Sequence, residues 1–365
     1  MAVSYYTIPL DSCKAHLSLY PYPTSHVARK SFLKNYIIIP SFYIISSFLY
    51  AIITIAISPR SKKMKRLLFV FNPHSGTGEV CKHLAEILDI FTKAGYETVA
   101  YPTQSARDGM NKISDDGEKY DRIVVSGGDG MLHELVNGVM AHSTPIPVGY
   151  IPTGTVNDFA STNNIPKSPL DAAALAVSDN IEKLDIGRFG SEYFSYVAAF
   201  GIATNISYDT DQKAKNTWGV LAYLANAVLT INPLTFNSFC HHMTITTDTG
   251  TLEGEFAFGA ISNSMSIAGM ANLTGKDVVL NDGLLEGLFI KKPQSLIDFD
   301  DIRTALIFRD FDYPNIHYVK SSRFEISAEK DVAWTLDGEK GGEHKDITIT
   351  AHKQVLSIAL PKDRR

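Results

Sequence analysis

The chain has 365 residues, of which 45% are hydrophobic and 20% charged, a composition typical of globular rather than disordered proteins. Its three cysteines are far apart and form no CxxC pair, which argues against a disulfide framework or a thiolate zinc site. Residues 1–66 carry nine basic side chains and one acid, so residues 67–365 are strongly acidic although the net charge is only −5. An acidic body binds nucleic acid poorly, and we exclude nucleic acid as a partner.

The chain begins with a basic and hydrophobic leader. Residues 36–58 contain no charged side chain and are long enough to span a bilayer. The following RSKKMKR is more basic than the preceding flank, which would place the C-terminal body in the cytoplasm, at the membrane. Alternatively, the leader is a translation artefact, and a soluble protein starts at Met64, directly before KRLLFVFNP. The sequence leaves both interpretations open.

From Lys65 onwards, short β-rich apolar runs alternate with segments of helical periodicity. The four predicted strands are 67–71, 96–103, 122–126 and 147–151. This alternation predicts a doubly wound, three-layer α/β domain with a parallel sheet. Ligands of such sheets bind beyond the carboxyl ends of the strands. Because the turns NPHSG, SGGDG and PTGTVND each follow a strand, we expect them to gather at that edge.

The pattern changes near Asp185. The remaining sequence is rich in alternating β-type runs separated by Gly, Asp and Asn turns, which predicts a mainly antiparallel β-sandwich. One helix, predicted over 218–231, is apolar nearly all round and is typical of a buried core element. We therefore expect a leader at 1–63, an α/β domain at 64–182 and a β-rich domain at 183–365.

The glycine turns do not match the common nucleotide or hydrolase motifs. The P-loop, the GxGxxG fingerprint, HExxH and GxSxG are all absent. What remains is Asp129 between Gly128 and Gly130, directly before a helix. Glycines permit close backbone approach, and a helix N-terminus attracts anions. This stretch is either a tight structural turn with an incidental acid or a phosphate site that a metal ion completes.

Five motifs in a fixed order resemble those of the diacylglycerol kinase-type lipid kinases, which include bacterial diacylglycerol kinases and sphingosine kinases. The motifs are NPHSG (72–76), SGGDGMLHELVNG (126–138), PTGTVNDFA (152–160), LNDGLLEG (280–287) and LDGE (336–339). NAD kinases and phosphofructokinases also carry GGDG, but not this series. The resemblance covers about residues 65–360 and none of the leader. It implies two domains, with ATP on the glycine loops and a lipid hydroxyl in the cleft between them.

The resemblance also implies roles for individual residues. Asp129 would reach the catalytic Mg²⁺, and Glu339 would be the base that accepts the proton of the lipid hydroxyl. Asp337 would shape the turn before Glu339. Thr103 is equally well explained as a plain strand-end residue. The residues expected to bind ATP are Asn72, Ser75, Gly76, Thr103, Gly127, Gly128, Asp129, Gly130, Gly154 and Thr155.

Two further features concern metal and nucleotide binding. By the same resemblance, the side chain of Asp282 and the carbonyls of Val279 and Leu284 would bind a structural Mg²⁺, an ion that prefers oxygen ligands. The alternative is a hairpin turn, for which Asn-Asp-Gly is a common sequence. Met131 stands where the family usually has Thr. We therefore expect the loss of a hydroxyl contact to the phosphates and weaker or altered nucleotide binding.

The sequence thus predicts an ATP- and Mg²⁺-dependent lipid kinase that acts on a membrane lipid, with diacylglycerol as the first acceptor to consider. In that case the helix at 218–231 would be either core or one wall of an acyl-chain pocket. The alternative acceptors are a sphingoid base, a prenol or a phospholipid. Two other functions remain: an NAD kinase-like small-molecule kinase, and a non-catalytic regulator, which only Met131 supports. The oligomeric state is open, with a homodimer among the options.

Overall fold

The computed structural model describes residues 64–155, 157–201, 240–264, 266–267, 270–271, 278–308 and 312–362. Residues 64–365 form one compact unit. Within the described ranges, no helix has the length and hydropathy needed to cross a membrane. The membrane span predicted at 36–58 and the helix predicted at 218–231 lie outside those ranges.

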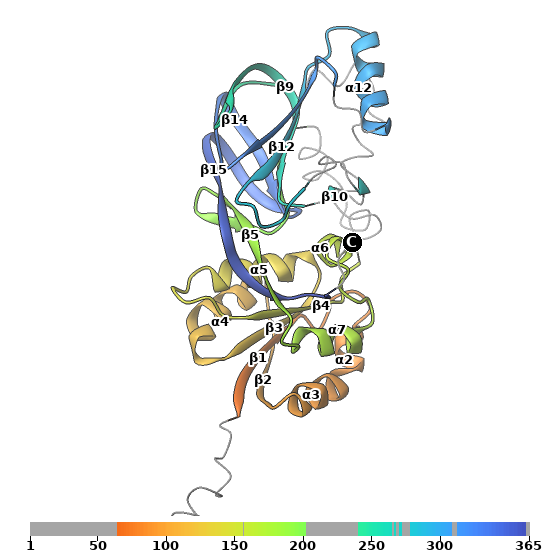
Figure 1. Cartoon of the computed structure of the whole chain (residues 1–365), viewed down its shortest axis with the longest axis vertical. Helices are drawn as coiled ribbons and strands as arrows, with labels where there is room; N and C mark the ends of the chain where they lie inside the picture. The colour runs from red at the N-terminus through yellow and green to blue at the C-terminus, as the bar shows by residue number, and fades with distance from the viewer. Residues whose placement is uncertain are drawn as a thin grey trace, which may run out of the picture. The chain divides into compact units, whose positions relative to one another are not determined.

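Four parallel strands form the first part of the sheet. They are β1 (Lys65–Phe71), β2 (Tyr96–Pro102), β3 (Arg122–Gly127) and β4 (Val148–Pro152). Their order is β2-β1-β3-β4, and each neighbouring pair is parallel (Figure 1). The four strands predicted from the apolar runs are therefore confirmed. Every residue of β3 and β4 is buried, as expected for parallel strands covered on both faces.

Helices pack on both faces of these strands (Figure 1). Helices α3 (Leu84–Lys93) and α7 (Pro169–Ala176) contact each other on one face, and α4 (Asp108–Asp116) and α5 (Asp129–Val139) contact each other on the opposite face. Shorter helical segments connect them. These are α2 (Glu79–Lys82), η2 (Gly117–Lys119) and α6 (Asp158–Thr162).

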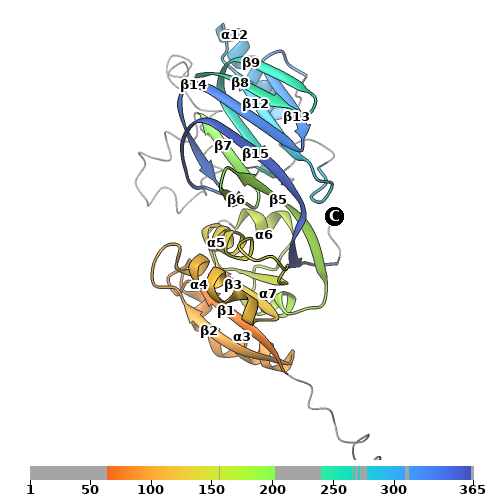
Figure 2. The same cartoon turned by 90° about the vertical axis from the view of Figure 1, so that its left-hand side faces the viewer.

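The second part of the chain is mainly antiparallel. Its strands are β5 (Ile181–Phe189), β6 (Glu192–Phe194), β7 (Val197–Gly201), β8 (His241–Thr247), β9 (Gly250–Ser262), β12 (Leu285–Lys291), β13 (Ile316–Ser321), β14 (Arg323–Leu336) and β15 (Glu339–Ala359), with the small pair β10 (Ser266–Ile267) and β11 (Met270–Ala271) and one helix, α12 (Leu296–Phe308). Figure 2 shows the longer of these strands. Their side chains form a hydrophobic core that includes Phe200, Phe289 and Trp334. An α/β part is thus followed by a large antiparallel β-rich part, as the sequence predicts.

The last strand, β15, connects the two parts. Most of it pairs antiparallel with β14 and β5, but near its end Ile358 pairs in parallel with Val148 of β4. A register shift precedes this segment, and Gln354 has a left-handed φ of 54° there. Leu356 and Ile358 then pack into the hydrophobic core of the α/β part. The described strands, apart from the β10–β11 pair, therefore form one sheet of 13 strands, and a domain boundary near residue 183 stays a prediction.

Candidate active site

The turn after β1 is held in place by its own asparagine. The side-chain Oδ1 of Asn72 accepts a hydrogen bond from the His74 amide at 2.9 Å, and the Asn72 amide donates to the Ser126 carbonyl at 3.0 Å. Gly76 has a φ of 56°, and a Cβ atom there would lie 2.3 Å from the Thr153 carbonyl oxygen. Only glycine fits at such an approach. The first turn is therefore fixed against those that follow β3 and β4.

The second and third glycine turns also contact each other directly. The Gly127 carbonyl accepts hydrogen bonds from the amides of Thr153 at 2.9 Å and Gly154 at 3.2 Å. A Cβ atom on Gly154 would lie 2.4 Å from the Cα of Gly128. The Gly154 amide also donates to Oδ1 of Asn157 at 3.1 Å. These contacts confirm that the three glycine turns gather at the carboxyl ends of the parallel strands.

Three other predicted ATP-binding residues lie on these turns or beside them. Ser75 is buried, and its amide donates to the Asn72 carbonyl at 3.2 Å. Thr155 is exposed at the third turn. Both the amide and the hydroxyl of Thr103 donate to the Phe71 carbonyl, at 2.9 and 3.4 Å. The Thr103 hydroxyl therefore has a structural role at the strand end, and its contact with the nucleotide stays a prediction.

Asp129 is the first residue of α5, and its carboxylate is only partly satisfied. Its Oδ2 accepts a hydrogen bond from the Asp158 amide at 3.3 Å, whereas Oδ1 is buried without a hydrogen-bond partner. Burial, followed by the charge of Asp158, raises the pKa of Asp129 to about 7. Burial also raises the pKa of Asp158. Such a pair of carboxyl groups is a suitable place for a cation.

Glu339 follows a two-residue turn between β14 and β15. Leu336 pairs with Glu339, and both central residues have left-handed φ angles, 52° for Asp337 and 87° for Gly338. An Asp-Gly sequence is the usual choice for such hairpins. One carboxylate oxygen of Glu339, Oε1, lies 3.0 Å from the position that a Cβ atom on Gly130 would occupy. The structure therefore brings Glu339 next to the helix start that carries Asp129.

Comparison with known proteins agrees with this geometry. Residues 66–189 match the family described as diacylglycerol kinase catalytic domain. The chain is 31% identical over 304 residues to a diacylglycerol kinase of Bacillus subtilis, covering 82% of this chain and 98% of that protein. The chain belongs to the diacylglycerol kinase family. It is also 32% identical to a diacylglycerol kinase of Staphylococcus carnosus, covering 82% of this chain and 96% of that protein.

Solved structures support the same fold. The crystal structure of a diacylglycerol kinase from Bacillus anthracis superimposes with a TM-score of 0.71 at 21% identity, covering 83% of this chain and 99% of that one. Family membership and the named relatives identify the chain as a lipid kinase, with a kinase's use of ATP as phosphate donor.

Sequence reasoning did not assign several side chains of this site. Asp158 was part of a quoted motif, but nothing in the motif showed that its amide would contact Asp129. His133 and Asn137 belong to the motif SGGDGMLHELVNG, which gave neither of them a role. In the structure, His133 lies 3.3 Å from Asp337, and Asn137 binds the main chain of Tyr193. The spacing of four residues from Asp129 to His133 and on to Asn137 was the available signal, since it places all three on one helix face.

The predicted structural metal loop is organised by a buried acid that sequence reasoning also left unassigned. The side chain of Asp185 accepts hydrogen bonds from the amides of Gly283 at 2.5 Å and Gln354 at 2.7 Å. Asp282 Oδ1 accepts from the Leu284 amide at 2.9 Å, which is a turn-forming contact. Val279 is 46% exposed. The described residues contain no cluster of three His, Cys, Asp or Glu side chains arranged for a metal, so Mg²⁺ binding by Val279, Asp282 and Leu284 stays a prediction.

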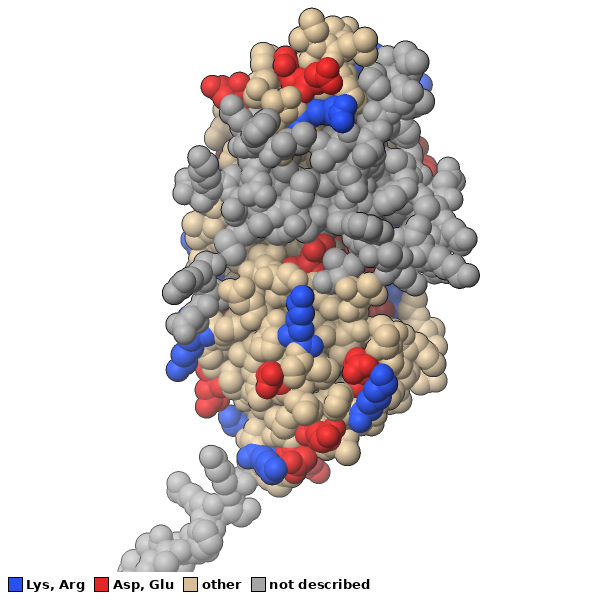
Figure 3. Space-filling model, turned by 90° about the vertical axis from the view of Figure 1, so that its right-hand side faces the viewer, with Lys and Arg blue, Asp and Glu red and all other residues tan. Residues whose placement is uncertain are grey.

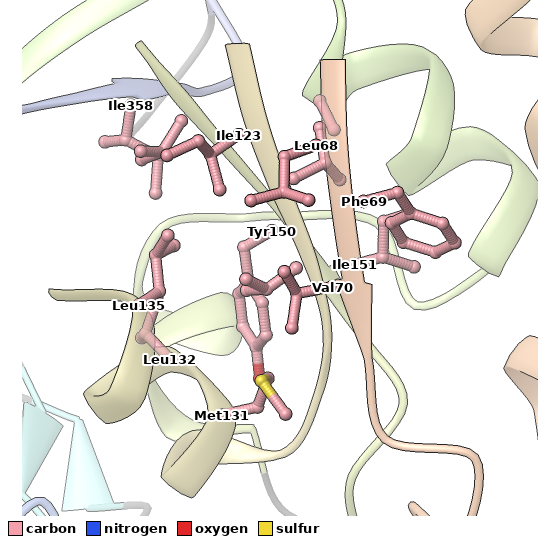
Figure 4. Packing of buried hydrophobic residues seen from close by; sticks show 14 of the residues in the cluster. Leu68, Phe69, Val70, Ile123, Met131, Leu132, Leu135, Tyr150, Ile151 and Ile358 are labelled. Atoms are coloured by element: carbon pink, nitrogen blue, oxygen red, sulfur yellow. The ribbon is translucent and has the colours of Figure 1, made fainter. Parts of the chain in front are cut away.

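Met131 points into the protein core rather than to the glycine turns. It is 7% exposed and belongs to the hydrophobic cluster of the α/β part. Its sulfur lies 3.3 Å from the position that a Cβ atom on Gly109 of α4 would occupy, and Figure 4 shows it among the other side chains of this cluster. A Cβ atom on Gly127 would lie 2.5 Å from the Met131 Cβ, which shows how closely the first glycine of the motif packs on this side chain. The position therefore acts through packing beneath the turn.

We expect Met131→Thr to lower stability and to leave nucleotide affinity unchanged. The smaller side chain leaves a void and buries a hydroxyl, at a cost of about 2–3 kcal/mol. Thermal unfolding and the KM for ATP measure the two effects. The same substitution at Met64, which is 51% exposed, serves as the control and is expected to change neither value. A lower KM for ATP in Met131→Thr, with unchanged stability, would support the sequence interpretation instead.

Proposed function

We propose that this protein transfers the γ-phosphate of ATP to a primary hydroxyl of a membrane lipid, with Mg²⁺ as cofactor and diacylglycerol as the preferred acceptor. One observation carries the proposal: the Glu339 carboxylate lies against Gly130, the residue after Asp129. Both are at the edge where the three glycine turns contact each other. A general base and a cation ligand therefore meet where the family motifs place the reaction. The acceptor hydroxyl would enter from the cleft between the α/β part and the β-rich part.

The residues around Asp129 suit Mg²⁺. The buried Oδ1 of Asp129 lacks a hydrogen-bond partner, and hard carboxylate oxygens are the ligands that this ion prefers. When bound, Mg²⁺ would supply charge neutralisation for the phosphoryl group. Asp129 would hold the ion, with water and phosphate oxygens completing its shell.

The chain's own residues perform the remaining steps. The glycine turns bring main-chain amides close to the phosphates, and Glu339 accepts the proton of the acceptor hydroxyl as that oxygen attacks phosphorus. Asp337 orients this base: its side chain accepts hydrogen bonds from the amides of Ser195 at 2.7 Å, Tyr196 at 3.0 Å and Val197 at 3.1 Å. The turn that carries Glu339 is thereby fixed on its own sheet.

A membrane lipid as acceptor means that the enzyme works at a bilayer surface. On the face shown in Figure 3, acidic and basic side chains of the described residues are interspersed and form no continuous basic patch. Because residues 67–365 are strongly acidic and residues 1–66 are basic, we propose that affinity for the bilayer comes from the acceptor itself and from the basic leader, where the native protein has one. A homodimer and a cytoplasmic catalytic body remain proposals from the sequence.

Phosphorylation of a lipid panel tests the proposed function. The purified full-length protein is incubated with Mg²⁺, γ-labelled ATP and neutral phospholipid vesicles that contain diacylglycerol, a sphingoid base, a prenol or no acceptor, and NAD is tested in parallel. We expect label in phosphatidic acid, lost on chelation of Mg²⁺. Label on NAD instead of any lipid would establish a small-molecule kinase. Nucleotide binding without any labelled product would establish a regulator.

A further inference from the structure

A chain of polar contacts runs from helix α5 to the turn before Glu339. His133 lies on α5, four residues after Asp129, and its Nδ1 is 3.3 Å from Oδ2 of Asp337. The His133 side chain is 15% exposed, and that of Asp337 is fully buried. The same Asp337 oxygen also accepts hydrogen bonds from the amide and the hydroxyl of Ser195. The amides that bind the Asp337 side chain belong to residues 195–197, whereas His133 reaches it from α5.

Asp337 fixes the proton of His133 on Nδ1, and Asn137 lies beside Nε2. Asn137 Oδ1 accepts from the Tyr193 amide at 2.9 Å, and its Nδ2 donates to the Tyr193 carbonyl, also at 2.9 Å. This pair of bonds determines which end of the amide is nitrogen. Nδ2 also donates to the His133 carbonyl at 3.0 Å and lies 3.3 Å from Nε2 of His133. Because the carboxylate of Asp337 can only accept, Nδ1–H donates to it, and in the neutral ring Nε2 is then the unprotonated nitrogen.

The contact with Asp337 persists whether or not the imidazole is charged. Burial lowers the pKa of His133, but the hydrogen bond to Asp337 and the charges of Asp337, Glu192 and Glu339 raise it, with a net upward shift. A second proton would go to Nε2, on the Asn137 side. Nδ1–H therefore faces Asp337 in both states, and its role does not depend on titration.

We propose that His133 is a positioning residue for phosphoryl transfer: it holds the Asp337–Gly338 turn against α5 and so keeps Glu339 beside Asp129. The inference rests on the proposed function. The amides of residues 195–197 fix the turn on its own sheet. His133 supplies the link from the turn to the helix that carries Asp129 and Gly130. A base displaced by about 1 Å can cost about 100-fold in rate without affecting substrate binding.

The test compares His133→Ala with His133→Asn and with a matched control. We expect His133→Ala to lower kcat by about 10- to 100-fold and to change the KM for ATP by less than about threefold. Asn carries an amide nitrogen close to the position of Nδ1, so His133→Asn should recover most of the lost kcat. The control is His142→Ala, which removes another buried imidazole, one that contacts the Ile113 carbonyl at 2.8 Å. This control should lower the melting temperature and leave kcat unchanged.

Two results would overturn the inference. The first is His133→Ala with wild-type kcat. The second is a loss of kcat that is equal in His133→Asn and His133→Ala. Selective ¹⁵N-histidine labelling of the full-length protein provides a readout that needs no activity: at a pH where the His133 ring is neutral, its resonances, assigned by their loss in His133→Asn, should show protonated Nδ1 and unprotonated Nε2. The opposite tautomer would contradict the proposed contact. Absence of lipid phosphorylation by the wild type would instead contradict the proposed function, while the tautomer still tests the contact.

Discussion

Glu339→Gln is expected to lower kcat by about 100- to 10,000-fold, the range typical of a lost general base. The amide has nearly the same shape as the carboxylate but cannot accept the proton of the acceptor hydroxyl. Because Glu339 lies against Gly130 through one oxygen, an isosteric replacement should preserve the packing. The KM for ATP should therefore stay nearly constant. Initial rates of lipid phosphorylation at saturating ATP measure the effect.

Glu343→Gln is the matched control for Glu339→Gln. Glu343 is an exposed acid on the same strand, four residues further along. Its substitution by Gln removes the same charge from β15. It should retain wild-type kcat. If Glu339→Gln also kept more than half of the wild-type rate, Glu339 would not be the base, and the proton would have to leave through another group.

The gathering of the glycine turns was predictable because topology determines it. Strands that alternate with helices form a parallel sheet, and the segments after their carboxyl ends then lie at one edge. The contacts of Gly76 with Thr153 and of Gly128 with Gly154 follow from this arrangement. The same alternation of apolar runs and helical segments predicted the four strands β1 to β4. Local periodicity is sufficient for features of this kind.

The direction of an individual side chain was not predictable in the same way. Met131 was compared with a family position and taken as a lost phosphate contact, yet its side chain is buried beneath the turn. His133 and Asp337 are 204 residues apart in sequence, and nothing local to either predicts their contact. Polar networks of this kind depend on how distant strands are placed.

The pairing of the end of β15 with β4 of the α/β part could not be predicted from the sequence either. The final run of alternating residues predicted a strand, which is correct, but the alternation does not indicate its partners. In the structure, the bulge at Gln354 changes the register, after which Leu356 and Ile358 enter the other core. Between His352 and Leu356, β15 advances four residues while β5 advances two, and the left-handed Gln354 lies within this irregularity. Such long-range pairing cannot be derived from the periodicity of one strand.

Asp129→Asn is expected to abolish lipid phosphorylation while stabilising the protein without metal at neutral pH. The activity is lost because the buried Oδ1 is replaced by a neutral amide that no longer holds a cation. The stability gain follows from the environment of the carboxylate, since burial and the charge of Asp158 disfavour its ionised form. Functional sites often lower the stability of the ligand-free protein in this way.

The dependence on pH has a definite sign. In the folded protein the pKa of Asp129 is about 7, whereas an unperturbed Asp has a value of 3.8. Between these values the folded state binds a proton that the unfolded state has released, so the contribution of this group to stability falls as the pH rises from about 4 to about 7. The total change is on the order of 4 kcal/mol. Asn resembles the protonated acid and should lack this dependence.

Thermal unfolding of the metal-free wild type and Asp129→Asn at pH 4, 6 and 8 tests this account. The variant should unfold at a higher temperature at pH 8, and the difference should disappear near pH 4. Added Mg²⁺ should stabilise the wild type at pH 8 and leave Asp129→Asn unchanged, because a ligand that binds only the folded state shifts the equilibrium toward it. Asp89→Asn, at an exposed acid paired with Lys93 on α3, should show none of these effects. A variant less stable than the wild type at pH 8 would mean that the Asp129 carboxylate supports the fold, and that the missing partner of Oδ1 is not a site kept for a cation.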